Sequence, residues 1–366
     1  MSTLFIGLMS GTSLDGVDAV LADFASLRPR VMAHAHHAFA TELRRELTLL
    51  ATPGWDDLNR AAIAAQHLAR AYAGVVEDLL IHSEIEANAV RAIGVHGQTV
   101  RHRPDAGYTV QLNAPAALAE LTEIDVVADF RSRDIAAGGQ GAPLVPALHA
   151  AIFTTAAPRA VVNIGGVSNL TGLPEASSTV DAIGFDCGPG NLLIDAWAQE
   201  HLGEPIDRDG HWAARGQTDA ALLAALLAEP FFAQPPPRST GRELFNLDWF
   251  SGKLAGRSIE PQNVQATLTR LSAAAIGRSI RDYFPRAADV IVCGGGAYNA
   301  TMIKMLAQEC APRPVVISSE LGIAPEQVEA LAFAWLAHAH LERRTGNLPT
   351  VTGARGRRVL GALYPA

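Results

Sequence analysis

Cysteine is scarce in this chain of 366 residues, which has only Cys187, Cys293 and Cys310 and no C-x-x-C pair. An odd number of cysteines without such a pair favours neither a disulfide framework nor a zinc site. Reduced cysteines are typical of intracellular proteins, and we therefore expect a cytoplasmic location.

Positive charge and long hydrophobic runs are also lacking. The net charge is -8, and no basic block or basic and aromatic stripe occurs, which argues against a nucleic-acid partner. The apolar N-terminal stretch has no basic flank and is broken by Gly7, Ser10 and Gly11, unlike a signal peptide. The most apolar later segment, ALLAALLAEPFFA, is interrupted by Glu229 and Pro230 and is too short to span a bilayer. We expect no membrane partner and a small hydrophilic ligand.

Apolar residues are plentiful, at 49% of the chain, so the sequence can bury sizeable cores. The length exceeds that at which one core usually stops growing, and we expect two domains. Residues 4–24 predict a strand, a glycine-rich turn and a second strand, and residues 158–173 repeat that order. This weak repeat predicts two α/β units whose polar loops face each other across a cleft.

Other segments alternate between strand and helix patterns. An Ala-rich segment from Asp56 to about Ala89 predicts a helix or a pair of helices. Strands are predicted near residues 30–39 and 89–104, strand–helix–strand in 109–139, strand–loop–helix in 182–203 and 288–310, and a helix in 264–284.

The loop GTSLDG, residues 11–16, has the composition of a phosphate-binding loop. Its glycines let backbone N–H groups point at an anion, and the Thr12 and Ser13 hydroxyls add donors. Asp15 or Asp18 could hold the water shell of a magnesium ion. The alternative is an ordinary hairpin turn, since Asp-Gly favours one. The spacing differs from G-x-x-x-x-G-K-[ST], which excludes a P-loop.

Two further glycine-rich loops occur in the second half. NIGGVSN, residues 163–169, repeats the composition of the first loop, and a pair of such loops suggests a clamp on a polyphosphate. CGGGAYN, residues 293–299, joins an apolar strand to a helix and lacks the G-x-G-x-x-G spacing of a dinucleotide fold. It allows either tight strand-to-helix packing or close backbone approach to a flat ligand such as adenosine.

Asp186, in GFDCGPGN, lies at the end of an apolar strand beside Gly188 and Gly190 and just before a helix. A carboxylate in this position can act as a base that activates a hydroxyl or a water molecule. Alternatively, Asp186 accepts hydrogen bonds from the loop and caps the helix, although Asn191 is itself a suitable cap.

Polar residues for a second substrate are concentrated in HGQTVRHRP and DFRSRD. These residues are His96, Gln98, Thr99, Arg101, His102, Arg103, Arg131 and Arg133. An arginine can bind a carboxylate through two parallel hydrogen bonds, although surface salt bridges explain most arginines. The run HAHH, residues 34–37, favours a solvated strand end over a metal site, because alternate residues of a strand face opposite sides.

The chain resembles the anhydro-N-acetylmuramic acid kinase family from Gly7 to about Ala354. The resemblance is carried, in the family's order, by GLMSGTSLDGVD, GVHGQTVRHRP, DFRSRDIAAGGQGAPLVP, NIGGVSNLT, GFDCGPGN, STGRELFN, VCGGGAYN and GNLPTVTGA. One departure is Cys187, where many members have threonine, which bears on how Asp186 is oriented.

The resemblance implies a fold of the actin, sugar kinase and Hsp70-like (ribonuclease H-like) type, with two related α/β domains and ATP between them. We place the first domain at residues 1–130 with 343–366 and the second at 131–342. The implied reaction converts ATP, water and 1,6-anhydro-N-acetylmuramic acid into ADP and N-acetylmuramic acid 6-phosphate, in cell-wall sugar recycling. The water, activated by Asp186, attacks C1, and O6 leaves the ring bond to receive the γ-phosphoryl group.

The resemblance also implies residue roles. We assign ATP binding to Gly11, Thr12, Ser13, Leu14, Asp15, Gly16, Val17, Asp18, Asn163, Gly165, Gly166, Gly294, Gly295, Gly296 and Asn299. We assign sugar binding to His96, Gln98, Thr99, Arg131 and Glu329, with a solvated helix glutamate as the alternative for the last, and Mg²⁺ to Asp15 or Asp18. A homodimer is implied as well. The rival functions are an ordinary sugar kinase of the same fold and a non-catalytic ATP-binding module.

Overall fold

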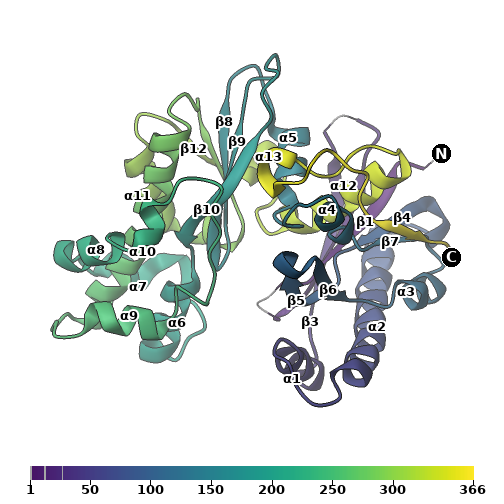
Figure 1. Cartoon of the computed structure of the whole chain (residues 1–366), viewed down its shortest axis with the longest axis horizontal. Helices are drawn as coiled ribbons and strands as arrows, with labels where there is room; N and C mark the ends of the chain where they lie inside the picture. Colours follow the sequence, from purple (N-terminus) through teal and green to yellow (C-terminus); the bar gives the residue numbers. More distant parts are fainter. Residues whose placement is uncertain (1, 12–13, 27) are drawn as a thin grey trace. The chain divides into compact units, whose positions relative to one another are not determined.

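The computed structural model describes residues 2–11, 14–26 and 28–366, and it divides into two compact units. Unit 1 comprises Met1–Ile152 and Gln327–Ala366, and unit 2 comprises Phe153–Glu326. Figure 1 shows the yellow C-terminal elements lying among the purple and blue N-terminal ones. Residues 131–152 and 327–342, which we assigned from the sequence to the second domain, therefore belong to unit 1.

Unit 1 is built on a six-stranded sheet in the order β13-β7-β4-β1-β2-β3. Its strands are β1 (Leu4–Met9), β2 (Gly16–Asp23), β3 (Arg30–Ala38), β4 (Val90–Val95), β7 (Val126–Ala128) and β13 (Ala362–Tyr364). Strand β1 is antiparallel to β2, β2 is antiparallel to β3, and β1, β4 and β7 are parallel. A separate hairpin pairs β5 (Gln98–Arg103) with β6 (Tyr108–Leu112).

Unit 2 repeats this topology in a five-stranded sheet with the order β10-β9-β8-β11-β12. Its strands are β8 (Arg159–Ile164), β9 (Val167–Leu173), β10 (Ile183–Pro189), β11 (Val290–Cys293) and β12 (Val315–Ile317). The first three strands form an antiparallel meander, and β8, β11 and β12 are parallel. Strands β8 and β9 thus take the places of β1 and β2, so the expected internal repeat is confirmed at the level of topology.

Helices cover both sheets. In unit 1 they are α1 (Thr41–Leu50), α2 (Asp57–Ser83), α3 (Pro115–Thr122), α4 (Ser132–Ala136), α12 (Gln327–Leu341) and α13 (Pro349–Thr352), and α5 (Val145–Phe153) ends at its boundary. In unit 2 they are α6 (Leu192–Leu202), α7 (His211–Arg215), α8 (Ala220–Leu227), α9 (Leu247–Leu254), α10 (Pro261–Tyr283) and α11 (Ala300–Cys310). Short 3₁₀ turns are at Ala87–Ala89, Pro104–Ala106, Arg208–Gly210, Pro230–Ala233, Gly295–Tyr298 and Ser318–Leu321.

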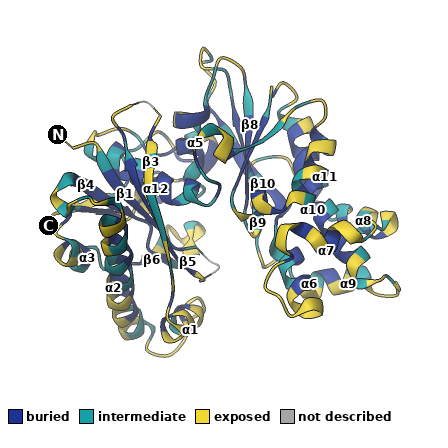
Figure 2. Ribbon diagram, turned by 180° about the vertical axis from the view of Figure 1, so that it is seen from behind, coloured by how far each residue is buried: buried dark blue, intermediate teal, exposed yellow. Residues whose placement is uncertain are grey.

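The core of unit 1 has a helix on each face of the sheet. Leu68, Tyr72 and Val75 of α2 are buried against the strands, and α12 contacts β1, β2 and β4. Gly7 of β1 and Gly94 of β4 pair in register beneath the backbone of α12, and this lack of side chains lets the helix lie close to the sheet. Figure 2 shows β1 and β4 mostly in dark blue, and yellow on the outer turns of α2 and α3.

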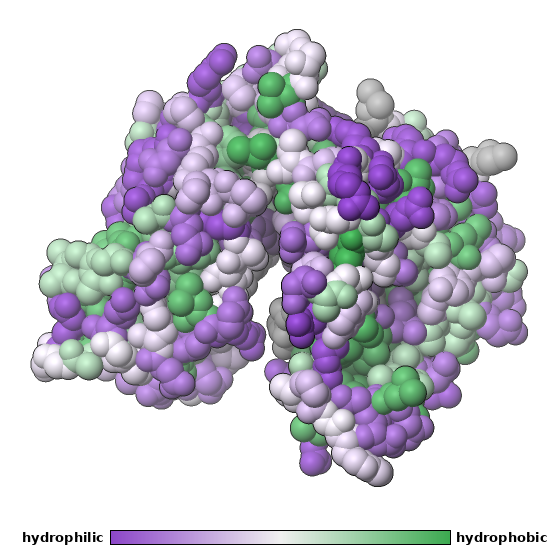
Figure 3. Space-filling model, viewed as in Figure 1, coloured by the Kyte–Doolittle hydropathy of each residue, from purple (hydrophilic) through white to green (hydrophobic). Residues whose placement is uncertain are grey.

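The surface carries mixed polarity. On the face drawn in Figure 3, hydrophilic and hydrophobic residues are interspersed over each unit. Among the residues described, none of the helices is both long enough and apolar enough to cross a bilayer.

Candidate active site

The polar residues of unit 1 follow the carboxyl ends of its parallel strands. Ser10 follows β1, His96 follows β4, and Arg131 lies just after β7. Since parallel strands end at the same edge of a sheet, these residues meet there, where open α/β sheets bind ligands. The structure brings together three of the residues predicted to bind sugar, His96, Arg131 and Glu329.

His96 links the loop after β1 to Arg131. Its Nδ1 lies 3.2 Å from the carbonyl oxygen of Ser10, and its Nε2 lies 3.1 Å from Nε and 2.8 Å from Nη2 of Arg131. Burial, together with the nearby Arg131 charge, lowers the pKa of His96 to about 3. The imidazole is therefore neutral, with Nδ1–H donating to Ser10 and the Nε2 lone pair accepting from Arg131.

Arg131 is held from several sides. Its Nη1 donates to the carbonyl oxygen of Gly141 at 2.7 Å. Burial lowers the pKa of Arg131 to about 10, although the charges of Glu329 and Asp134 raise it. The His96 ring also packs against Phe333 of α12, with centroids 4.8 Å apart. The guanidinium remains cationic at neutral pH and lies in the field of Glu329.

Asp134 fixes the loop that contacts Arg131, and no sequence pattern singled it out. It is fully buried, and its Oδ2 accepts from the backbone N–H of Gly141 at 2.8 Å. Its Oδ1 accepts from Nδ2 of Asn347 at 2.6 Å and from Oγ1 of Thr352 at 2.7 Å. The motif GNLPTVTGA thus supports the arginine from another part of the chain.

Two amide side chains lie near this edge. Nε2 of Gln98 donates to the carbonyl oxygen of Gly11 at 3.1 Å, which ties β5 to the loop after β1. Within the described part of the chain, Oε1 of Gln98 and both amide atoms of Asn113 are buried without hydrogen-bond partners. Asn113 was missed from the sequence because its position between β6 and α3 resembles an ordinary loop. Thr99, in contrast, accepts a hydrogen bond from Gln111 at 3.1 Å.

The other basic residues predicted here interact elsewhere. Arg101 pairs with Asp57 at 3.0 Å, and Arg103 pairs with Asp105 at 2.8 Å. His102 contacts Thr109 at 3.1 Å, and Arg133 is exposed on α4. The structure does not bring Arg101, Arg103 or Arg133 to the His96 cluster. His102 lies near enough to Arg131 that burial and the charge of this arginine lower the pKa of His102.

The loop after β1 contains the first group of predicted ATP-binding residues, of which Thr12 and Ser13 lie outside the described residues. Gly11 accepts from the N–H of Leu14 at 3.3 Å, and Leu14 has a left-handed φ of 58°. Oδ1 of Asp15 accepts from the N–H of Gly16 at 3.0 Å. Gly16 lies against the backbone of β3, and the Val17 side chain is in the core, so these two residues offer a ligand only their backbone.

Asp18, on β2, contacts two histidines of the neighbouring strand. Its Oδ1 lies 3.3 Å from Nε2 of His34 and 3.0 Å from Nδ1 of His36. His37 points elsewhere and contacts Asp78 at 2.7 Å. Among the described residues, no group of three or more metal-ligating side chains has metal-binding geometry. The alternation expected for residues 34–37 is therefore observed, and Oδ1 of Asp18 is engaged.

In unit 2, Asp186 lies on β10 beside the segment Arg238–Thr240. Oδ2 of Asp186 accepts from Oγ of Ser239 at 3.1 Å and from the N–H of Thr240 at 2.9 Å. Burial raises the pKa of Asp186, and these two hydrogen bonds counteract that rise. A carboxylate that acts as a base needs a pKa above that of a free carboxylate, but it must still be ionised to accept a proton. Burial acts in the first direction and the two hydrogen bonds act in the second.

The remaining predicted residues of unit 2 cluster around β8 and β11. Gly165 and Gly166 form the β8–β9 turn, and their carbonyl oxygens accept from backbone N–H groups at the start of α6. Gly294 has a positive φ of 78°, and a Cβ there would collide with Oδ1 of Asn163. Gly296 lies against Ile164, and Gly295 is open on its Cβ side. The two loops therefore pack on each other.

Asn299 has a structural role in unit 2. Its Oδ1 accepts from the N–H of Met302 at 2.9 Å and so caps α11. A Cβ on Gly210 would meet the same oxygen, so the turn at Arg208–Gly210 packs closely on this cap. Its amide oxygen is thereby engaged.

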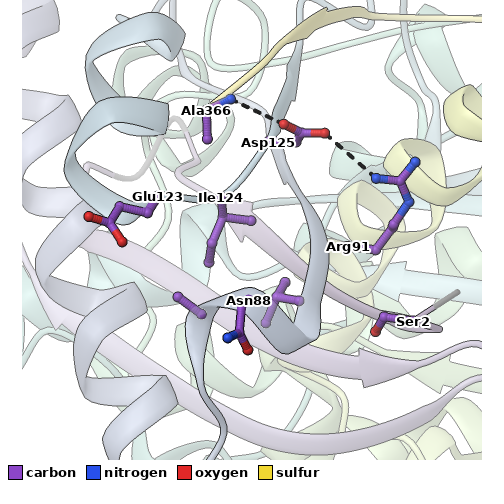
Figure 4. Close-up of a pocket in the computed structure, with 9 residues that line it drawn as sticks. Ser2, Asn88, Arg91, Glu123, Ile124, Asp125 and Ala366 are labelled. Atoms are coloured by element: carbon purple, nitrogen blue, oxygen red, sulfur yellow. Dashed lines mark hydrogen bonds and ion pairs between the residues drawn. The ribbon is translucent and has the colours of Figure 1, made fainter.

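A pocket of about 490 Å³ in unit 1 contains none of the predicted residues (Figure 4). It lies at the opposite edge of the sheet, where Arg91 is the second residue of β4 and Asp125 precedes β7. Arg91 pairs with Asp125 at 3.7 Å, and Asp125 also accepts from the N–H of Ala366 at 3.1 Å. The oppositely charged side chains of Arg91 and Asp125 in this pocket thus pair with each other.

Comparison with known proteins identifies close relatives. A family model described as anhydro-N-acetylmuramic acid kinase matches residues 3–366. The chain is 56% identical over 371 residues to the anhydro-N-acetylmuramic acid kinase of Variovorax paradoxus (strain S110), with 99% of each chain covered. It is 55% identical over 369 residues to that of Cupriavidus pinatubonensis, covering 99% of this chain and 98% of the relative.

One solved structure supports the fold. Component A of the (R)-2-hydroxyglutaryl-CoA dehydratase of Acidaminococcus fermentans gives a TM-score of 0.51 at 12% identity, covering 91% of this chain and 96% of that one. At this identity the likeness concerns the fold alone. The expected fold of two related α/β units is confirmed by the two matching sheets, and component A shares this fold.

Proposed function

The chain belongs to the anhydro-N-acetylmuramic acid kinase family, and from this premise we propose its reaction in full. The enzyme uses ATP and water to open the 1,6-anhydro ring of 1,6-anhydro-N-acetylmuramic acid and to phosphorylate O6. The products are N-acetylmuramic acid 6-phosphate and ADP, within cell-wall sugar recycling. The observation that carries this proposal is the family match over residues 3–366.

Asp186 is the proposed base. Its carboxylate takes a proton from a water molecule, whose oxygen attacks C1 of the sugar while the C1–O6 bond breaks. The electron pair of that bond stays on O6, which then bonds to the γ-phosphorus as ADP leaves. A carboxylate that activates water opposite the leaving oxygen is the arrangement of inverting sugar hydrolysis, with the phosphoryl group replacing the usual acid.

The glycine-rich loops are the proposed ATP-binding elements. Residues 11–18 and 163–166 would bind the phosphates through backbone N–H groups, and residues 294–299 would approach the adenosine. Asp15 and Asp18 suit a magnesium ion, which proteins usually hold through one or two carboxylates, water and phosphate. Oδ2 of Asp18 is the better-placed atom there, since its Oδ1 contacts His34 and His36. When bound, the ion would neutralise charge on the phosphates.

Unit 1 is proposed to bind the sugar through His96, Gln98, Thr99, Arg131 and Glu329. The lactyl carboxylate of the substrate is an anion, and a cationic guanidinium is its natural partner. Arg131 is the candidate because His96 and Gly141 fix its orientation. We further propose that the protein is cytoplasmic and forms a homodimer. A measurement of its molecular mass in solution tests the dimer.

Replacing Arg131 by lysine is expected to raise KM for the anhydro sugar roughly 10- to 100-fold, while KM for ATP changes little. An ammonium group cannot contact His96 and a carboxylate with the same fork of donors, and a lost charged hydrogen bond costs about 1.5–3 kcal/mol. Steady-state ADP release at varied sugar concentration measures the change. Arg133→Lys, an exposed position two residues away, is the matched control. If both variants have the same KM for the anhydro sugar, Arg131 does not bind the sugar.

The hydrolytic step distinguishes this enzyme from an ordinary sugar kinase. In water labelled with ¹⁸O, the product is expected to carry one labelled oxygen at C1, because that oxygen comes from the attacking water. Mass spectrometry of the product detects it, and a plain kinase acting on a free hydroxyl incorporates none. ADP release should also require the anhydro sugar, with N-acetylglucosamine and N-acetylmuramic acid as comparison substrates.

A further inference from the structure

The two oxygens of the Asp186 carboxylate have different surroundings. Oδ2 accepts hydrogen bonds from Oγ of Ser239 at 3.1 Å and from the backbone N–H of Thr240 at 2.9 Å. Oδ1 accepts no hydrogen bond from any side chain or backbone group in the part of the chain that the structure describes. One oxygen is thus fixed, and the other is available to a ligand.

The backbone of the same segment also pairs with Asp186. The N–H of Asp186 donates to the carbonyl oxygen of Arg238 at 3.1 Å, and Nε of Arg238 donates back to the carbonyl oxygen of Asp186 at 3.0 Å. On its other side β10 pairs with β9, and the register shifts between Asp186 and Gly188. This bulge places an extra residue, Cys187, in the strand, and bulges redirect neighbouring side chains. Asp186 is therefore fixed from both sides.

Arg238 anchors the segment to the core of unit 2. Its side chain is buried, and Nη1 donates to the carbonyl oxygen of Gln234 at 2.6 Å and Nη2 to Oγ of Ser279 at 3.0 Å. The guanidinium lies 5.1 Å from the ring centroid of Phe185, the residue before Asp186. Among the described residues it pairs with no carboxylate at ion-pair distance, so its hydrogen bonds go to neutral groups. A buried arginine that donates hydrogen bonds from all three of its side-chain nitrogens holds the surrounding segment in position.

We propose that residues 238–240 form a carboxylate clamp, which holds Oδ2 of Asp186 and leaves Oδ1 as the atom that receives the proton. This inference rests on the proposed function, in which Asp186 is the base. As an O–H bond of the water breaks, the Oδ1–H bond forms, and the water oxygen uses its freed electron pair to attack C1. Ser239 and Arg238 act through Asp186, and they are positioning residues.

The clamp also influences when Asp186 is ionised. Burial and the nearby charge of Glu243 raise the pKa of Asp186. The hydrogen bonds from Thr240 and Ser239 and the charge of Arg238 lower it, because they stabilise the charged form. Loss of the Ser239 hydroxyl therefore raises the pKa further. Since a base must be ionised to act, the acidic limb of the kcat profile then moves to higher pH.

Ser239→Ala is the variant that tests the clamp. Because Ser239 is exposed, we expect this variant to fold as the wild type does. The acidic limb of kcat against pH is expected to move up by roughly half a unit to one unit, so the loss of rate is largest at acidic pH. Ser239→Thr, which keeps a hydroxyl, should restore the limb. Ser251→Ala is the matched control, because Ser251 is an exposed serine on α9 of the same unit and lies outside the segment 238–240.

The outcomes separate the clamp from the proposed base. If the limb stays in place in Ser239→Ala while Asp186→Asn is inactive, the base stands and the clamp is wrong. If Ser251→Ala moves the limb as far as Ser239→Ala, the effect is not specific to the hydroxyl that donates to Asp186, and the clamp is wrong again. If Asp186→Asn retains turnover, the proposed function loses its base, and the clamp falls with it.

Discussion

Asp186→Asn is expected to abolish turnover of the anhydro sugar while ATP binding is retained. Asparagine has nearly the same shape, and its amide oxygen can still accept from the N–H of Thr240, which now donates to Oδ2 at 2.9 Å. The amide cannot take a proton from water, and general base catalysis typically contributes 10²- to 10⁴-fold to a rate. A coupled assay of ADP release measures turnover, and calorimetry measures ATP binding.

Asp248→Asn is the matched control for this experiment, because Asp248 is an exposed carboxylate on α9 of the same unit. It should retain the wild-type rate. Sugar-dependent ADP release that persists in Asp186→Asn would contradict the assignment of the base. It would instead favour a protein in which the loops bind nucleotide and Asp186 serves only the fold.

The topology could be predicted because its signals are local. Each sheet begins with two apolar strands joined by a glycine-rich turn, and such a turn between β-branched residues is readable in a single segment. The two hairpins became β1–β2 and β8–β9. The order of five strands is the same in both units, and unit 1 adds β13 at one edge. The helix expected from Asp56 is α2, which spans Asp57–Ser83.

The membership of α12 in unit 1 could not be predicted in the same way. Its residues are apolar on nearly all sides, so the sequence pattern does not indicate which sheet it covers. The assignment depends on how closely it packs against β1 and β4, which only the folded chain shows. We did not predict the helix α1 (Thr41–Leu50). Its three leucines are buried by tertiary packing, which is likewise seen only in the folded chain.

In the candidate site, too, some residues could be predicted from local sequence and others could not. Asp186 was recognisable from a strand end beside glycines, whereas its partners Arg238 and Ser239 lie about fifty residues further along the chain. His96 and Arg131 were proposed separately as sugar ligands, and their mutual hydrogen bonds, 3.1 and 2.8 Å long, emerge only in the fold. Local patterns thus identify reactive side chains, while the groups that orient them come from distant segments.

Gly94→Ala is expected to destabilise unit 1 by at least about 2 kcal/mol, because overpacking a close contact costs about 1–3 kcal/mol and here the neighbour is backbone. A Cβ on Gly94 would lie 2.0 Å from the carbonyl oxygen of Phe333, and on Gly7, its partner in register, 1.9 Å from that of Ala330. The helix α12 would have to move away from the sheet. Thermal unfolding followed by calorimetry should show a melting temperature lowered by roughly 4–8 °C.

Movement of α12 has a functional consequence as well, since Glu329 and Phe333 of that helix lie near Arg131 and His96. KM for the sugar is therefore expected to rise in Gly94→Ala at temperatures where the protein is still folded. Gly74→Ala is the matched control: Gly74 lies inside α2, and apart from its chain neighbours and the nearby backbone of that helix, no heavy atom of the described residues lies within 4 Å of the added Cβ. Alanine is the better helix former, so this variant should gain about 0.5–1 kcal/mol. If both variants melt at the wild-type temperature, close packing of α12 on β4 does not limit the stability of unit 1.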